Sequence, residues 1–336
     1  MKRLPLVSIV IPTYNQVHLV DDAIKSAVTQ DYERLEIVVS DDGSTDGTPD
    51  RIRRWMQEYP GRVIGLVDQP HLGITGNCNR AMSASTGEYV AFGAGDDMFL
   101  PGKISAQVAW FEADSNRVLC GHDVEVFESE SNRRLYLWSE RHRLRTGAGA
   151  AGVIAGASCV SSSIMVRRTS IPHYGFDDRF PVSSDTKLWV DCLAAGGQYG
   201  YVHGLYGRYR RHAGNLTNVD DRRKSEALFA DMLSFYTIVA AEYPSLAAVC
   251  ARRRAGVCWW IAGWYLRRGE KDSAKPYLRD ALTRITRSSS VADRLIALVP
   301  GGSALRVLMM LRRNVRGAVV QLRGRYDRLR SSSRTS

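Results

Sequence analysis

Two adjacent carboxylates, Asp96 and Asp97, are separated by three residues from the end of a short apolar run, and their position suggests chemistry. The run Tyr89–Phe92 is bounded by glycines and is typical of a buried strand. In an open α/β sheet, ligands bind at the carboxyl ends of strands. Neighbouring carboxylates there can hold a hard divalent cation against a phosphate. The alternative is that one of them caps the helix predicted to begin at Pro101.

Two more polar turns follow apolar runs nearer the N-terminus. The run Val7–Ile11 is β-branched and continuous, as expected for a strand buried on both faces, and it ends at Pro12-Thr13-Tyr14-Asn15. The run Leu35–Val39 leads into a turn dense in carboxylates and hydroxyls, Ser40 to Asp46. These turns and the acidic pair lie on one edge of the predicted sheet, where a single ligand could touch all of them.

The elements that must position these turns alternate between strand and helix. Apolar residues recur at helical spacing after each of the first two strands, and a third strand is predicted at Val63–Val67. A further helix opens at Gly73 and leads to the strand at Tyr89. Four alternations of this kind are the signature of a doubly wound parallel sheet.

The next part of the chain is less regular. We expect strands at Val118–Phe127, Cys159–Val166 and Tyr199–Tyr209, and an amphipathic helix with Ser184-Asp185 at its start. Between them, three glycines fit the Gly-x-Gly-x-x-Gly spacing of dinucleotide-binding loops: Gly147, Gly149 and Gly152. That fingerprint requires an apolar strand just before it, whereas charged residues precede it here. We interpret this stretch as a mobile loop.

The charge of the chain is unevenly distributed. Its 336 residues suggest about two domains, and 44% apolar with 24% charged residues is typical of a globular protein. Residues 1–219 contain 23 Lys+Arg and 25 Asp+Glu (net −2), whereas residues 220–336 contain 23 and 10 (net +13). We therefore predict a neutral domain over residues 1–219 and a basic helical region over residues 220–330. Nucleic acid is not expected as a partner, because the terminal arginines lack interleaved aromatic residues.

The six cysteines are scattered, with no Cys-x-x-Cys and no paired Cys/His spacing. This argues against a zinc site or a disulfide framework and favours a reducing cytosol. The N-terminal apolar run is too short for a signal peptide, and no stretch reaches 18 uninterrupted apolar residues. We expect a cytoplasmic protein without a transmembrane helix.

The C-terminal region is predicted to be helical. Residues Cys258 to Leu282 have the spacing of one tetratricopeptide-like hairpin, which cannot form a solenoid alone and is interpreted as a local hairpin. From Arg284 to the end there are 12 basic and 2 acidic residues, and the arginines recur on helical segments. We predict peripheral binding of residues 284–330 to an anionic membrane surface at its inner face. The alternative is a solvated helix that packs back on the body.

Taken in order and spacing, four signals resemble the family-2 glycosyltransferases of the GT-A fold. They are Pro12-Thr13-Tyr14-Asn15, Asp41 to Asp46, Gly95-Asp96-Asp97 with Leu100-Pro101, and Phe176-Asp177 with Ser184-Asp185 through Leu188-Trp189. The resemblance covers roughly residues 5–218. It implies an α/β nucleotide-diphospho-sugar transferase fold with a doubly wound mixed sheet. It also implies transfer of a sugar from a nucleoside-diphosphate sugar to a glycan or lipid-linked acceptor, with inversion and with Mg²⁺ or Mn²⁺.

The resemblance also implies roles for individual residues. Asp97 would ligate the metal, Asp96 would contact the ribose or the metal's water, and His212 would lie near the diphosphate and the metal. Asp185 matches the catalytic base, which takes the proton of the acceptor hydroxyl. The remaining donor-binding positions would be Pro12, Thr13, Tyr14, Asn15, Asp41, Asp42, Asn77 and Arg80. A carboxylate can accept from a base imide N–H, and an arginine can offset phosphate charge.

Two positions depart from the family pattern. Ala94 stands where many relatives have an aspartate, and Ser184 stands where a glutamate often precedes the base. These departures keep open a non-catalytic alternative, a GT-A-like module that binds nucleotide or glycan while its helical tail recruits a partner. A nucleotidyltransferase is the other rival, but the turn Pro12 to Asn15 does not supply the basic glycine-rich loop it would need. We expect an enzyme that takes part in the synthesis of a cell-surface polysaccharide.

Overall fold

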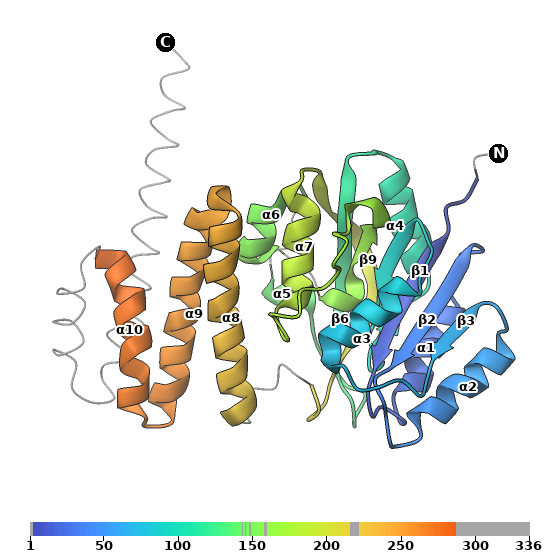
Figure 1. Cartoon of the computed structure of the whole chain (residues 1–336), viewed down its shortest axis with the longest axis horizontal. Helices are drawn as coiled ribbons and strands as arrows, with labels where there is room; N and C mark the ends of the chain where they lie inside the picture. Colours follow the sequence, from blue (N-terminus) through green and yellow to red (C-terminus); the bar gives the residue numbers. More distant parts are fainter. Residues whose placement is uncertain are drawn as a thin grey trace, which may run out of the picture. The chain divides into compact units, whose positions relative to one another are not determined.

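The computed structural model describes residues 3–142, 144, 146–147, 149–157, 160–215 and 222–286. Contacts within the chain divide it into two compact units, Met1–Arg253 and Arg254–Ser336. The first unit contains the sheet, its flanking helices and the helix α8 (Arg222–Glu242) (Figure 1). The division at residues 219 and 220 stays a prediction, although the described residues 222–286 are mainly helical as expected.

Within the described residues, nine strands form one mixed sheet. Their order is β3-β2-β1-β4-β8-β6-β9-β5, and β7 pairs with β6. The four strands β3, β2, β1 and β4 are parallel, β8 is antiparallel to both of its neighbours, and β6 and β9 are parallel. The strands are β1 (Val7–Thr13), β2 (Leu35–Asp41), β3 (Val63–Leu66), β4 (Tyr89–Phe92), β5 (Met98–Phe99), β6 (Arg117–Glu128), β7 (Arg134–Leu137), β8 (Met165–Arg167) and β9 (Gln198–Arg211).

Helices connect these strands and continue after them. The helices of the sheet domain are α1 (Val20–Val28), α2 (Thr48–Glu58), α3 (Gly73–Ser83), α4 (Lys103–Glu112), α5 (Trp138–Arg141), α6 (Gly149–Gly152) and α7 (Ser184–Ala194). Short turns of other helix types are η1 (Val153–Ala157), η2 (Ser161–Ser163), η3 (Arg168–Ser170) and η4 (Pro244–Leu246). The expected alternation of strand and helix through β4 is confirmed, and so is the helix that begins with Ser184.

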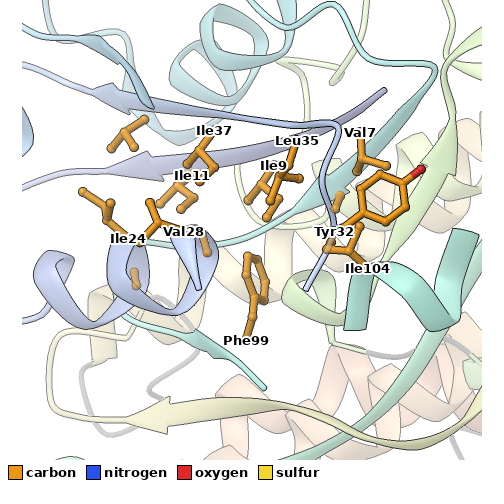
Figure 2. Close-up of a cluster of buried hydrophobic side chains, with 14 of the residues drawn as sticks. Val7, Ile9, Ile11, Ile24, Val28, Tyr32, Leu35, Ile37, Phe99 and Ile104 are labelled. Carbon is orange, nitrogen blue, oxygen red and sulfur yellow. The ribbon is translucent and has the colours of Figure 1, made fainter. Parts of the chain in front are cut away.

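The main core lies between β1, β2 and the helices of one face of the sheet. Alternate residues of β1 and β2, such as Ile9 and Ile37, pack against Ile24 of α1 and Ile104 of α4 (Figure 2). The residues in between, such as Val10, are also buried, because helices cover both faces of these parallel strands. A strand buried on both faces is held in one register, so the turns at its end are presented in a defined place.

Three details differ from the expectations above. The helix predicted at Pro101 begins at Lys103, because Gly102 adopts φ 85° and makes a turn before it. The strand predicted at Cys159–Val166 is confined to β8, and the three serines before it form the 3₁₀ turn η2. The glycine-rich stretch contains the short helix α6 where a mobile loop was expected.

The second unit contains a helical hairpin. It is formed by α9 (Ala247–Arg267), most of which lies in this unit, and α10 (Lys271–Thr286), as the pattern from Cys258 to Leu282 predicts. The rings of Tyr265 and Tyr277 stack across it, with centroids 5.8 Å apart. No helix in the part of the chain that the structure describes is long and apolar enough to cross a membrane. Most of the predicted membrane-binding segment, from residue 287, lies outside the described residues.

Candidate active site

The turns after β1 and β2 lie side by side because the two strands are paired in register. Thr13 is opposite Asp41, the last residue of β2. Asn77 of α3 lies across both strand ends, donating to the carbonyls of Thr13 (3.3 Å) and Ser40 (2.9 Å) and accepting from the Ser40 hydroxyl (2.6 Å). All these groups are buried. Asn77 therefore braces the strand ends, and its direct contact with a donor stays a prediction.

The two turns also bind each other. The N–H of Asn15, which has φ 49°, donates to the Ser44 hydroxyl (2.7 Å), and its side-chain oxygen accepts from the N–H of Thr45 (2.9 Å). Asp41 is buried and accepts from the N–H of Ser44 (2.9 Å). Tyr14 is 47% exposed on the rim. The two turns predicted to bind the nucleoside therefore form one continuous surface, and Asp41 and Asp42 are buried beneath it.

The second of those acids, Asp42, faces a different set of groups. Its carboxylate accepts from the N–H of Leu72 (2.8 Å) and lies 3.0 Å from His71 Nδ1. The Arg80 guanidinium donates to the Asp41 carbonyl (3.1 Å) and lies 3.8 Å from the Asp42 carboxylate. Arg80 therefore brings a partly buried positive charge to this edge of the sheet, where a phosphate would need one.

The acidic pair lies close to the β1 turn. A side chain at Gly95 would overlap the side chains of Gln16 and Thr13, so glycine permits the close approach. Asp96 is beside His212, whose Nε2 is 2.9 Å from the carboxylate. Asp97 is 5% exposed, and burial followed by the neighbouring Asp96 charge raises its pKa to about 8. A bound cation would offset the repulsion between these two carboxylates.

The end of β9 holds this pair in place. The N–H of Arg210 donates to Asp97 (2.9 Å), and its guanidinium donates to the Asp96 carbonyl (2.8 Å) and to Asp22 of α1 (2.8 Å). Asn215 accepts from the N–H of His212 (2.7 Å) and donates to the Arg210 carbonyl (3.2 Å). The strand order explains the proximity, since β5, which follows the pair, is antiparallel to β9.

Asp185, in the first turn of α7, reaches the same edge. One carboxylate oxygen, Oδ1, accepts from the N–H and the hydroxyl of Thr186, and the other, Oδ2, accepts from the hydroxyl of Ser161. Burial raises the pKa of Asp185, and these hydrogen bonds oppose that rise. The thiol of Cys78 on α3 has a pKa raised to about 12 by burial, then by the charges of Asp185 and Asp42. Both Asp185 and Asp42 act on this thiol, so the two acids lie near α3.

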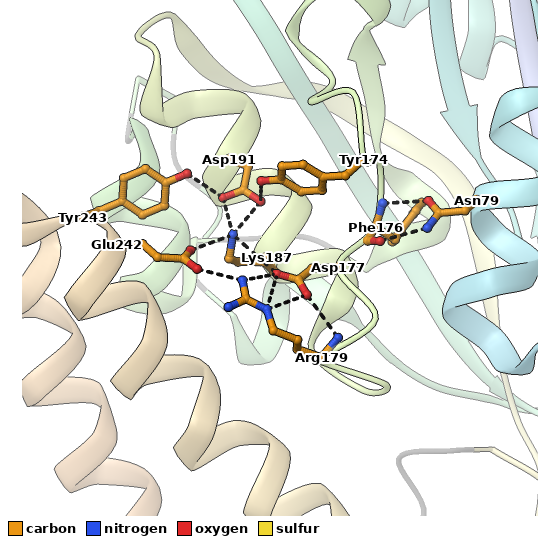
Figure 3. A network of polar contacts seen from close by, with 9 residues as sticks. All are labelled: Asn79, Tyr174, Phe176, Asp177, Arg179, Lys187, Asp191, Glu242 and Tyr243. Carbon is orange, nitrogen blue, oxygen red and sulfur yellow. Dashed lines mark hydrogen bonds and ion pairs between the residues drawn. The ribbon is translucent and has the colours of Figure 1, made fainter.

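Three further contacts position α7. Trp189 packs edge-on against Phe92, the last residue of β4, at 4.9 Å between ring centroids. Asp231 of α8 accepts from the N–H groups of Val182 (3.0 Å) and Ser183 (2.9 Å), which precede the helix. Lys187 is 1% exposed, and its ammonium forms ion pairs with Asp191 of α7 and with Glu242 at the end of α8 (Figure 3). The predicted base is therefore fixed from the sheet and from α8.

Sequence reasoning missed the residues that support these acids. Ser161 and Asp231 belong to none of the motifs above, and Arg210 and Asn215, which flank His212 in the sequence, are given no role by them. The three consecutive serines at 161–163 were a visible signal, but the run was assigned to a strand. No group of three or more His, Cys, Asp or Glu side chains in the described ranges is arranged to hold a metal ion.

The mixed sheet, with its four parallel strands β3, β2, β1 and β4 and its connecting helices, defines an α/β domain. Residues 8–175, which are half of the chain, match the sequence profile of Glycosyl transferase family 2. The chain belongs to this family, and the expected family and GT-A fold are confirmed.

Relatives of known sequence match a shared part of the chain. The uncharacterised protein Mb1547 of Mycobacterium bovis is 29% identical over 225 residues, which are 65% of this chain and 62% of that protein. This chain thus spans less than two thirds of the length of Mb1547. The UDP-Glc:alpha-D-GlcNAc-diphosphoundecaprenol beta-1,3-glucosyltransferase WfaP of Escherichia coli is 27% identical over 221 residues, covering 64% of this chain and 80% of WfaP.

Solved structures share the architecture. The mannosyltransferase PcManGT of Pyrobaculum calidifontis, solved with GDP-Man and Mn²⁺, superposes with a TM-score of 0.57 at 17% identity. The match covers 96% of this chain and 88% of PcManGT. At this identity the likeness concerns the fold.

Proposed function

We propose that this chain is an inverting glycosyltransferase, which moves a sugar from a nucleoside-diphosphate sugar to a hydroxyl of a glycan or lipid-linked acceptor. The observation that supports the proposal is that acids stand at the end of β2, just before β5 and in the first turn of α7, in the order of the family pattern. Asp41 ends β2, Asp97 directly precedes β5, and Asp185 is the second residue of α7. Ser161, in the turn η2 before β8, donates to the Asp185 carboxylate. Family membership supports the same reaction class.

The proposed donor site follows the β1 and β2 turns. Asp41, Asp42 and the Pro12–Asn15 turn would hold the nucleoside, with Tyr14 at the exposed rim. Arg80 would offset diphosphate charge, since its guanidinium already faces the Asp42 carboxylate. Asn77 would act here by keeping the two strand ends together.

A divalent cation would be shared between the acidic pair and the donor phosphates, because the described side chains alone do not form a site of three ligands. Asp96, Asp97 and His212 offer carboxylate and imidazole ligands, and Mg²⁺ is commonly held by one or two carboxylates plus substrate phosphates. A bound Mg²⁺ or Mn²⁺ would neutralise charge that develops on the departing diphosphate. The mutual repulsion of Asp96 and Asp97 gives a physical reason for such a site.

Asp185 is the proposed base. Its Oδ2 takes the proton of the acceptor hydroxyl while that oxygen forms a bond to the anomeric carbon. The bond from that carbon to the diphosphate oxygen breaks in the same step, and the bond electrons leave with the diphosphate. Attack from the face opposite to the leaving group inverts the anomeric configuration. A carboxylate in this role typically contributes about 10²–10⁴ in rate.

The setting we propose is the synthesis of a cell-surface polysaccharide at the cytoplasmic face of a membrane. WfaP, a relative, is named for a diphosphoundecaprenol-linked acceptor, which supports a lipid-linked acceptor here. The net charge of +13 over residues 220–336 supports peripheral attachment through residues 284–330 to anionic lipid.

The test is turnover by the full chain. UDP-, dTDP- and GDP-sugars would be supplied with Mn²⁺, with and without lipid-linked acceptor extracts, and diphosphate release measured. Asp185→Asn should lower turnover by about 10²-fold or more, and Asp97→Ala should abolish it. Asp178→Asn, an exposed matched control close to α7, should leave it unchanged.

Equal turnover in all three variants would contradict the site assignment. Tight nucleotide binding by the wild-type chain with no turnover on any donor would favour the non-catalytic alternative.

A further inference from the structure

The helix α7, which carries the proposed base in its first turn, has no cap from its own side chains. The side chain of its N-cap residue, Ser183, accepts no hydrogen bond from the helix. The first N–H groups of a helix have no partner within it and need acceptors from elsewhere. Asp231 of α8 supplies two, since Oδ2 accepts from the N–H of Val182 (3.0 Å) and Oδ1 from the N–H of Ser183 (2.9 Å). A carboxylate that binds one N–H with each oxygen fixes the backbone immediately before α7.

Other residues on the same side of α8 contact this part of the chain. The ring of Phe235 packs edge-on against Phe180, with centroids 5.9 Å apart, and both side chains are buried. At the end of the helix, Glu242 forms an ion pair with Lys187 of α7 (3.1 Å) (Figure 3). Residues 231, 235 and 242 follow the spacing i, i+4 and i+11, which places them on one side of a helix with 3.6 residues per turn.

The Asp231 carboxylate is a buried charge near the base. Asp231 is 7% exposed, and a buried carboxylate is costly unless hydrogen bonds compensate it. Burial and then the charge of Asp231 raise the pKa of Asp185, while hydrogen bonds from Ser161 and Thr186 oppose the rise. The other titratable group that interacts with Asp185 is Cys78 of α3. Asp231 therefore acts on the base through its charge as well as through the backbone.

These contacts come from a helix that lies beyond the family pattern. The profile match ends at residue 175, whereas α8 spans Arg222–Glu242. We propose that α8 belongs to the catalytic unit of this chain and that Asp231 is a positioning residue for Asp185. The inference rests on the proposed glycosyl transfer and deepens it. Asp231 acts through the backbone of residues 182 and 183, and it takes no proton from the acceptor.

The first experiment is steady-state turnover of Asp231→Asn in the full chain. Asparagine keeps the shape of the side chain but loses the charge and one of the two acceptor oxygens. We expect kcat to fall about 10- to 100-fold, because a small displacement of the base is costly. The KM for the nucleotide-sugar should stay unchanged, because other elements hold the donor. Glu226→Gln, an exposed matched control on α8, should change neither quantity.

Two further variants separate positioning from a general loss of stability. A residue that acts only through the base should have little effect once the base is gone, so Asp231→Asn added to Asp185→Asn should lower the residual turnover by less than about twofold. Asp231→Glu keeps the charge but displaces the carboxylate, and it should lower kcat even if Asp231→Asn does not fold. Losses that multiply in the double variant would overturn the proposal, as would wild-type kcat in Asp231→Glu.

One readout does not need turnover. The ¹³C carboxyl signal of Asp185, identified by its loss in Asp185→Asn, should titrate at lower pH in Asp231→Asn than in the wild type, because a neighbouring negative charge is removed. The same signal should not move in Glu226→Gln. An inactive wild-type chain that shows this displacement would overturn the proposed function but support the role of α8. An unmoved signal in Asp231→Asn would overturn the role of α8 itself.

Discussion

Replacing Lys187 by methionine removes the cation at the centre of a buried acidic cluster. The Lys187 ammonium lies 2.7 Å from Asp191, 3.1 Å from Glu242 and 3.9 Å from Asp177 (Figure 3). Lys187 and Asp191 are 1% and 3% exposed, whereas Glu242 is 33% exposed. Methionine has a similar length and no charge, so the perturbation is electrostatic rather than steric.

The expected magnitude follows from what remains after the change. Breaking a buried ion pair by removing one partner typically costs about 3–5 kcal/mol. The low end applies here because the hydroxyls of Tyr174 (2.9 Å) and Tyr243 (2.8 Å) still donate to Asp191. A loss of about 3 kcal/mol in the free energy of unfolding corresponds to a fall in Tm of about 6–12 °C for a unit of this size.

The assay is urea and thermal denaturation of the full chain. Lys25→Met, on the exposed surface of α1, is the matched control and should stay within about 0.5 kcal/mol of the wild type. Adding Asp191→Asn to Lys187→Met should recover at least about 1 kcal/mol, because it removes the orphaned charge. A loss below about 1 kcal/mol in the single variant would refute the view that this network fastens α7 to α8.

Two other predictions concern the sheet. Burial opposes ionisation of Glu36, but hydrogen bonds led by that from Ser8 (2.6 Å) outweigh it and hold the pKa below its usual value. The ionised form therefore stabilises the fold above about pH 4.3 and loses this effect as pH falls through the lower folded pKa. Glu36→Gln should lower the free energy of unfolding at pH 7 by about 1–3 kcal/mol, with the difference shrinking below about pH 4 in urea titrations. Gly95→Ala should cost about 1–3 kcal/mol and weaken UDP binding by calorimetry, because its Cβ overlaps Gln16. Gly256→Ala, in open space, should not destabilise, and equal losses in both would contradict the packing argument.

Local patterns were sufficient for the elements that carry the site. The β-branched run before Pro12 and the apolar run before Asp96 predicted strands, which β1 and β4 confirm. Each signal is complete within a few residues, because burial on both faces requires apolar side chains and the following turn requires polar ones. The same holds for α7, where Asp185 precedes an apolar-periodic helix.

The pairing of the strands and the hydrogen bonds between distant residues could not be predicted from local patterns. The strand β8 inserts antiparallel between β4 and β6, and the serines before it form a turn. Whether Ser161 pairs within a strand or donates a hydrogen bond to an aspartate depends on partners that are distant in the chain. Asp231 likewise looks like any helical aspartate until its helix is placed against α7.

The amino-acid sequence by itself determined the family, the order of the first strands and helices, and the acids that stand at the strand ends. Only the tertiary structure decided which distant residues support those acids, such as Ser161 at Asp185 and Arg210 at Asp97. The physical reason is the separation in sequence over which each kind of interaction acts. Periodicity and turn chemistry act between near neighbours, whereas a buried hydrogen bond between residues 161 and 185 exists only after the sheet, α4 and α7 have packed together.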